Sequence, residues 1–155
     1  MRAGIGFDVH AFDASRPLIL GGVTIPGAPG LAGHSDADVI SHAIADAILG
    51  AAGLGDIGEH FPDSDPRWKD ASSIDLLKVV ADLVAARSMS VASIDAVVLL
   101  EEPKIAPYKH EMRSNIAAAL GADPDLVSVK ATTTEKLGTV GRGEGAACMA
   151  VALLT

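Results

Sequence analysis

The chain has 155 residues and a formal net charge of −8 at pH 7, with 49% hydrophobic and 21% charged residues. This composition is typical of a globular protein with a substantial core and excludes an intrinsically disordered chain. The negative charge and the aromatic content of only 3% argue against nucleic acid or an anionic membrane as the main partner. The lone cysteine, Cys148, excludes a disulfide framework and favours a cytoplasmic location. We therefore expect a single domain over residues 1–155, without a secretion signal or a membrane-spanning segment.

Residues 2–12 alternate between apolar and polar or small side chains, which predicts a β-strand. One face, which we expect to be buried, carries Ile5, Phe7, Val9 and Ala11. The other face carries Asp8 and His10, which project side by side because they are two residues apart. This spacing suits two ligands of one metal ion, although a half-exposed strand with two polar residues is an equally open interpretation. Residues 18–27 then predict a short strand or hairpin with glycine turns.

The next segment predicts a helix that begins at Ser35, where Asp38 completes a capping-box spacing, and that ends near Gly53. Its apolar stripe consists of Ile40, Ile44, Ala47, Ile48 and Ala51. The opposite face consists of His34, Asp38, His42 and Asp46. Imidazoles and short carboxylates are metal ligands, whereas a merely solvated face is usually built from Glu, Lys and Arg. Either His34 or His42 could join Asp8 and His10 in a two-histidine, one-carboxylate zinc site, and the spacing does not choose between them.

The remaining elements follow in chain order. A loop over 53–66, rich in Gly, Asp and Pro, carries Asp56, His60, Asp63 and Asp65 and is either a ligand-contacting loop or a plain turn. After it we expect a helix over 72–89, a strand over 90–104, a helix over 107–122, a strand over 126–135, a glycine-rich turn over 136–145 and a strand over 146–155. This order predicts an α/β fold with a mixed β-sheet and helices packed on one face.

The strand over 126–135 ends in three threonines and an acidic residue. Thr132 and Thr133 offer hydroxyl groups, and Glu135 offers a hard oxygen ligand that suits magnesium or manganese. A threonine run is also simply a good β-strand sequence, so the motif is not specific by itself. The glycine-rich turn brings Arg142 and Glu144 together, and it does not match a P-loop.

Four blocks, in order along almost the whole chain, make the sequence similar to a known family. They read GIGFDVHAF, GHSDADVISHAIADAILGAAGLGDIGEHFPDSD, PK-x-x-P and KATTTEKLGTVGRGEG. They resemble the 2-C-methyl-D-erythritol 2,4-cyclodiphosphate synthase family of the non-mevalonate isoprenoid pathway. The resemblance implies a lyase that converts 4-diphosphocytidyl-2-C-methyl-D-erythritol 2-phosphate to the cyclic 2,4-diphosphate and releases CMP. It also implies a homotrimer with its sheets around the three-fold axis and its active sites between subunits.

The same resemblance implies roles for individual residues. Zinc would be held by Asp8, His10 and His42, and magnesium or manganese by Glu135 together with the substrate diphosphate. Catalytic roles near the phosphates fall on His34 and Thr133. The full set expected to contact substrate is Asp8, His10, His34, Ser35, Asp56, Ile57, Gly58, Phe61, Asp63, Asp65, Leu100, Pro103, Lys104, Ala106, Thr132, Thr133, Glu135, Thr139 and Arg142. In relatives, Arg142 lies at one end of an axial cavity able to hold an isoprenoid diphosphate.

Two positions depart from the family pattern. Thr139 is polar where an aromatic residue is frequent, which puts contacts near the pocket or the trimer axis in question. Glu101 and Glu102 stand where uncharged residues are common. Because family contacts to cytosine there are mostly made by the backbone, we expect these two glutamates to leave binding intact.

Two other functions remain alternatives. A zinc-dependent phosphohydrolase would use a metal-bound water and would need a general base beside the zinc. A non-catalytic trimer that binds metal or isoprenoid diphosphates would leave the cytidine segment and Glu135 without a purpose.

Overall fold

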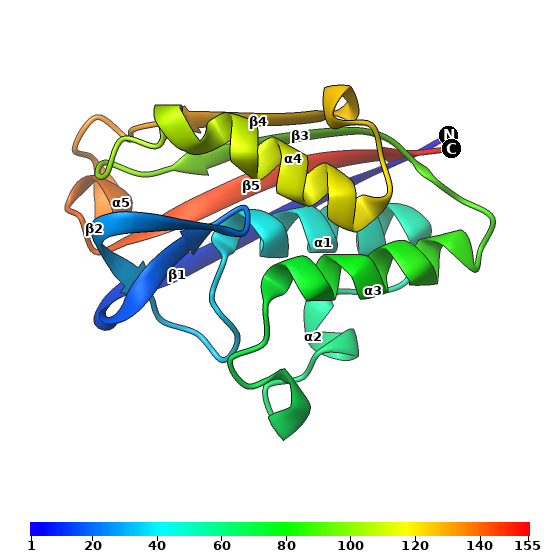
Figure 1. Ribbon diagram of the computed structural model, residues 1–155, viewed down its shortest axis with the longest axis horizontal. Coiled ribbons are helices and arrows are strands. Elements are labelled where there is room, and N and C mark those ends of the chain that lie inside the picture. Colours follow the sequence, from blue (N-terminus) through cyan, green and yellow to red (C-terminus); the bar gives the residue numbers. More distant parts are fainter.

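The computed structural model describes residues 1–155 and contains one mixed five-stranded sheet in the order β2-β1-β5-β3-β4 (Figure 1). The strands are β1 (Arg2–Leu20), β2 (Val23–Leu31), β3 (Val91–Leu99), β4 (Val127–Thr132) and β5 (Gly145–Leu154). Only the β3–β4 pair is parallel, because an α-helix connects these two strands, whereas every other pair is antiparallel. The predicted mixed sheet is confirmed.

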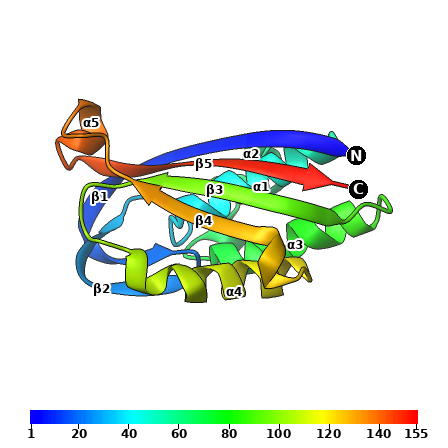
Figure 2. The same ribbon diagram turned by 90° about the horizontal axis from the view of Figure 1, so that it is seen from above.

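The long helices pack on the inner face of the curled sheet: in Figure 2 the helices over 39–52 and 73–85 lie behind the strands, and the helix over 109–120 lies beside β4. The helices are α1 (Val39–Ala52), α2 (Ile57–His60), α3 (Ser73–Ala85), α4 (Lys109–Leu120) and α5 (Gly138–Gly141). The apolar core lies between the sheet and the three long helices. None of the helices combines the length and apolar composition needed to cross a membrane.

The strand β1 uses its two faces in the opposite way from the prediction. Ile5, Phe7 and Val9 are 66%, 54% and 53% exposed on the face of the sheet that no helix covers. The other face meets α1, and it does so through Gly4 and Gly6, where a Cβ atom would overlap backbone atoms of Ala47 or Ala43. Glycines are needed here because α1 lies directly against the strand. The Asp8 and His10 side chains project toward this same helix.

The helix α1 begins later than predicted, at Val39, because Asp38 rather than Ser35 is its N-cap. The Asp38 side chain accepts hydrogen bonds from the backbone N–H groups of Ile40 and Ser41, both at 3.2 Å. It also accepts from the N–H groups of Gly21 and Gly22 in the β1–β2 turn, at 2.9 and 2.8 Å. The Asp38 carboxyl is therefore fully buried, not on a solvated helix face, and it ties the first hairpin to the start of the helix.

Most other boundaries differ from the prediction by a few residues. The loop over 53–66 contains the short helix α2, and the glycine-rich turn contains α5. The helix α3 buries Leu76, Leu77, Val80 and Val84. The helix α4 ends at Leu120 and is followed by Gly121, whose left-handed conformation (φ 61°) is favourable for glycine.

Candidate active site

Three potential metal ligands meet where β1 approaches the first turn of α1. The Oδ2 atom of Asp8 lies 2.9 Å from Nε2 of His10 and 3.0 Å from Nδ1 of His42. The two histidine nitrogens are 3.3 Å apart. Two imidazole nitrogens and one carboxylate oxygen within 4.8 Å of one another can share a single cation at ordinary zinc–ligand lengths of about 2.0–2.2 Å. This grouping includes His42 and not His34, a choice that the spacing of the residues alone left open.

The Asp8 carboxylate attracts positive charge, and in the metal-free cluster a proton on His10 competes with a metal ion for this position. Burial would raise the pKa of Asp8, but hydrogen bonds and charge from His10 and His42 hold it well below its ordinary value. Burial opposes protonation of His10, yet the hydrogen bond and charge of Asp8 raise the pKa of this histidine overall. The carboxylate is thus ionised, and it attracts positive charge to the point where the three side chains converge.

The far side of His42 is held by a second set of polar groups. Its Nε2 atom lies 2.8 Å from Oγ of Ser73 and 3.0 Å from Oγ of Ser35. The Ser73 hydroxyl donates a hydrogen bond to Oδ1 of Asp36, and the Ser73 backbone N–H donates to Oδ2 of the same carboxylate at 2.9 Å. Because the Ser73 proton is directed to Asp36, its oxygen is available to accept the Nε2 proton of His42. This arrangement turns the Nδ1 atom of His42 toward Asp8 and His10.

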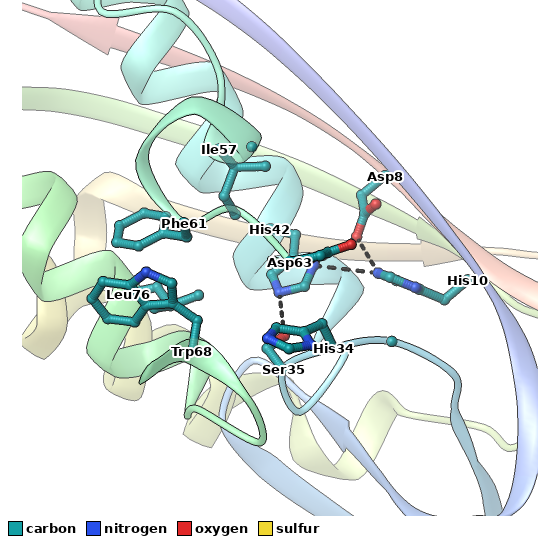
Figure 3. Close-up of a pocket in the computed structure, with 12 residues that line it drawn as sticks. Asp8, His10, His34, Ser35, His42, Ile57, Phe61, Asp63, Trp68 and Leu76 are labelled. Carbon is teal, nitrogen blue, oxygen red and sulfur yellow. Dashed lines mark hydrogen bonds and ion pairs between the residues drawn. The ribbon is translucent and has the colours of Figure 1, made fainter. Parts of the chain in front are cut away.

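The cluster forms one end of a cavity of about 440 Å³ (Figure 3). The polar end is completed by His34, Ser35 and Asp63, and the apolar end by Ile57, Phe61, Trp68 and Leu76. The rings of Phe61 and Trp68 pack edge to face, with centroids 5.0 Å apart. A polar end with potential metal ligands beside an apolar wall suits a small ligand that has both a polar group and a carbon skeleton. The sequence missed Trp68 and Leu76 because only the fold shows which apolar residues turn toward the ligands.

Some of the residues predicted to contact substrate line a second cavity of about 240 Å³. It is lined by the predicted Leu100, Pro103, Lys104, Ala106, Thr132 and Thr133, together with Ile105, Lys109 and Ala131. Lys104 and Lys109 give this cavity positive charge, and the sequence analysis had overlooked Lys109. No residue lines both cavities, so the predicted substrate contacts of this chain lie in two separate places.

Several predicted contacts lie in neither cavity. Asp56 caps α2 through the Glu59 N–H group, and the Asp65 side chain pairs with Arg67. Thr139 is exposed on α5. Within one chain, these three side chains therefore do not face either cavity.

Glu135 and Arg142 also lie apart from the two cavities. Glu135 is exposed and accepts a hydrogen bond from the Thr133 hydroxyl at 2.9 Å. Arg142 pairs with Glu144 at 2.6 Å and lines a third cavity of about 480 Å³ with, among others, Phe12 and Lys136.

Fold and site define an α/β protein with a candidate divalent-metal centre in the wall of an open cavity. A family model described as the YgbB family matches residues 1–155. A curated protein of Chlorobaculum parvum named 2-C-methyl-D-erythritol 2,4-cyclodiphosphate synthase is 59% identical over 154 residues, which cover 99% of this chain and 98% of the relative. This chain belongs to the 2-C-methyl-D-erythritol 2,4-cyclodiphosphate synthase family, also described as the YgbB family.

Solved structures agree with this assignment. The bifunctional IspDF from Campylobacter jejuni superposes with a TM-score of 0.95 at 50% identity, covering 99% of this chain and 42% of that one. A CDP complex of IspF from Plasmodium falciparum superposes with a TM-score of 0.85 at 35% identity, covering 99% of this chain and 94% of that one.

Proposed function

We propose that this protein is a 2-C-methyl-D-erythritol 2,4-cyclodiphosphate synthase, a lyase whose single domain spans residues 1–155. It converts 4-diphosphocytidyl-2-C-methyl-D-erythritol 2-phosphate to the cyclic 2,4-diphosphate and releases CMP. The observation that carries the proposal is the convergence of Asp8, His10 and His42 on one point at the wall of a cavity. The name shared by relatives at 59% identity and the CDP bound to a related structure support the choice of substrate.

The reaction forms one bond and breaks one bond at the same phosphorus atom. An oxygen of the substrate's 2-phosphate attacks the β-phosphorus, and the bond from that phosphorus to the oxygen bridging to the α-phosphate breaks. The electron pair leaves with CMP, and no water is consumed. Because the nucleophile is a phosphate oxygen of the substrate itself, the protein's main task is to bring two ends of one polyanion together.

The donor set fits zinc, which takes two histidines and a carboxylate in catalytic sites. Asp8, His10 and His42 would hold one cation and Glu135 would help to hold magnesium or manganese, and these ions would supply positive charge to the phosphoryl oxygens. Ser73 and Asp36 orient His42 for this task. The protein has a net charge of −8, so local cations must carry the attraction for a polyanion.

The other residues bind and orient the substrate. His34 and Ser35 are at the polar end of the first cavity, where their donors can meet the phosphate groups. The apolar wall with Ile57 and Phe61 covers the carbon skeleton and keeps water from the reacting phosphorus. In the second cavity, Lys104 and Thr133 meet the nucleotide phosphates, and Leu100, Pro103 and Ala106 enclose the cytosine ring.

We further propose that the active protein is a cytoplasmic homotrimer with its three sheets around the axis. The uncovered sheet face carries exposed apolar side chains from β1 and β5: Ile5, Phe7, Val9, Met149 and Val151. A large apolar patch on a water-exposed face favours association with another chain. Assembly would also place the first cavity of one subunit near the second cavity of its neighbour. The axis between the three apolar faces, with Arg142 near one end, would accept an isoprenoid diphosphate.

Phosphorus NMR on the cytidyl substrate with zinc and magnesium tests the activity. We expect a cyclic diphosphate together with CMP. Release of free phosphate would instead identify a zinc-dependent phosphohydrolase, and unchanged substrate would identify a non-catalytic metal-binding or isoprenoid-binding trimer. His42→Ala should remove zinc binding and turnover together, so full activity of this variant would refute the ligand assignment.

A further inference from the structure

Two neighbouring glutamates follow β3, and they have opposite surroundings. The side chain of Glu101 is buried, with 7% of the residue exposed, whereas Glu102 is exposed. Neither residue is among the substrate or metal contacts expected from the sequence. A buried carboxylate is costly unless hydrogen-bond donors surround it, so the contacts of Glu101 indicate what it does.

All the partners of the Glu101 carboxylate come from one turn of the chain. Its Oε1 atom accepts hydrogen bonds from the Thr134 N–H at 2.9 Å and the Lys136 N–H at 3.3 Å. The Thr134 hydroxyl lies 3.2 Å from the same oxygen. The ammonium of Lys136 lies 3.1 Å from Oε2. The two residues that contact Glu101 are the immediate neighbours of Glu135 on either side.

This turn needs such support because its backbone is strained. Glu135 and Lys136 have φ angles of 55° and 64°, a left-handed conformation that is unfavourable for residues with side chains. The N–H groups of Thr134 and Lys136 are directed at one point, and an anion placed there compensates for the strain. The Glu101 carboxylate is that anion.

The turn over residues 133–136 carries two residues that are proposed to act on the substrate, Thr133 and Glu135. Thr133 lines the second cavity, and its hydroxyl donates a hydrogen bond to Oε1 of Glu135 at 2.9 Å. Both side chains therefore depend on the backbone path between residues 133 and 136. We propose that Glu101 is a positioning residue, which holds this turn in the conformation that presents Thr133 and Glu135 to the diphosphate and its cation. The inference rests on the proposed function for the identity of that ligand.

Three variants separate positioning from ordinary stability. Glu101→Ala removes the anion. Glu101→Gln keeps an acceptor oxygen for the two N–H groups but loses the ion pair with Lys136. Glu102→Ala is the matched control, because this neighbouring carboxylate is exposed and has no hydrogen bond or ion pair to the turn. The readouts are backbone amide exchange at Thr134 and Lys136, turnover as a function of magnesium concentration, and bound zinc.

For Glu101→Ala we expect amide exchange at Thr134 to accelerate about 10-fold, since one hydrogen bond of ordinary strength is lost. The magnesium concentration for half-maximal turnover should rise by a similar factor, about 10-fold, while bound zinc stays at one per chain. Glu101→Gln should recover most of both properties, and Glu102→Ala should match the wild type.

A rescue variant tests the strain directly. Glycine adopts a positive φ without strain, so Lys136→Gly in the Glu101→Ala background should restore part of the magnesium response. Lys136→Gly alone is its control. If Glu101→Ala does not fold, the same readouts are taken on this double variant.

The outcomes distinguish this inference from the proposed function. Unchanged amide exchange and an unchanged magnesium response in Glu101→Ala, with an active wild type, would overturn the positioning role alone. Parallel loss of zinc would overturn it too, because the effect would then be global. A wild type that fails to form the cyclic diphosphate would overturn the proposed function, and with it the ligand assumed here.

Discussion

His42 has different environments at its two ring nitrogens, and this difference makes it a suitable metal ligand. Its Nδ1 atom faces Asp8 and His10, while Nε2 faces the hydroxyl of Ser73. Outer hydrogen-bond partners of this kind fix the histidine tautomer and strengthen metal binding. The serine reaches this position because its N–H and hydroxyl are both held by Asp36.

Ser73→Ala should therefore weaken zinc binding about 10-fold to 100-fold, the usual effect of losing an outer partner. Competition with a chromogenic chelator would measure the affinity. Ser72→Ala is the control, since Ser72 precedes α3 without a side-chain hydrogen bond and should change nothing. Equal affinities of the Ser73 and Ser72 variants would show that this hydroxyl does not orient the ligand.

The Glu101 carboxylate predicts a specific dependence of stability on pH. Burial alone would raise its pKa, but hydrogen bonds from Lys136 and Thr134 lower the pKa from 4.5 to about 2. A carboxyl whose pKa is lower in the folded protein stabilises the fold above pH 4.5, and this contribution is lost as the pH falls toward 2.

We thus expect urea unfolding midpoints of the wild type to exceed those of Glu101→Gln at pH 6, with the difference shrinking at pH 3. Glu102→Gln should show no such trend relative to the wild type. A constant difference between wild type and Glu101→Gln at both pH values would mean that the carboxylate charge contributes nothing to stability.

At the residue scale, the spacing of the residues could predict the types of ligand but not the complete set, which came only from the family resemblance. Asp8 and His10 share a strand face by simple alternation, so their pairing needs no tertiary information. Choosing His42 required the register of α1, which depends on Asp38 as its N-cap. Asp38 takes the N-cap position because its carboxylate also accepts long-range hydrogen bonds from Gly21 and Gly22, which no local sequence pattern encodes.

At the scale of elements, the site depends on the close approach of α1 to β1. Asp8 and His10 belong to the strand and His42 to the helix, so the distance between the two elements sets the distances between the ligands. Gly4 and Gly6 permit this approach, since a Cβ atom at either position would overlap the helix backbone.

Gly6→Ala should therefore cost about 1–3 kcal/mol in the free energy of unfolding and weaken zinc binding, because the helix must move away from the strand. Gly50→Ala is the matched control within α1, where a Cβ atom meets nothing within 4 Å. It should stabilise the protein by about 0.5–1 kcal/mol through helix propensity. Urea unfolding and zinc titration measure both effects, and a Gly6→Ala protein as stable as the wild type would contradict this packing argument.

The element scale also explains the wrong prediction for β1. Alternation correctly separated the two faces of the strand, but it did not say which face the helices cover. The face with Ile5 and Phe7 was assigned to the core because it is apolar, whereas α1 needs the small residues of the opposite face. Alternation predicts the buried face from its apolar side chains, whereas close packing of a helix backbone against a strand requires glycine.

At the scale of the whole molecule, two features of the single chain remain unexplained, and one assembly would explain both. Exposed apolar side chains on β1 and β5 lack a partner, and the predicted substrate contacts are split between two cavities that share no residue. Both follow if three copies assemble through the uncovered sheet face and complete each other's sites.

Val151→Asp tests this assembly, because Val151 lies on β5 within the patch, 48% exposed and paired across the sheet with Ile5. A charge at the proposed interface should convert the trimer to monomers, as measured by light scattering after size exclusion, since burying an unpaired carboxylate is costly. The zinc ligands lie within one chain, so zinc should still bind while turnover falls. Val79→Asp, on the exposed side of α3, should leave a trimer. If the Val151 variant remained trimeric, the subunits would meet elsewhere, and the apolar face would need another partner.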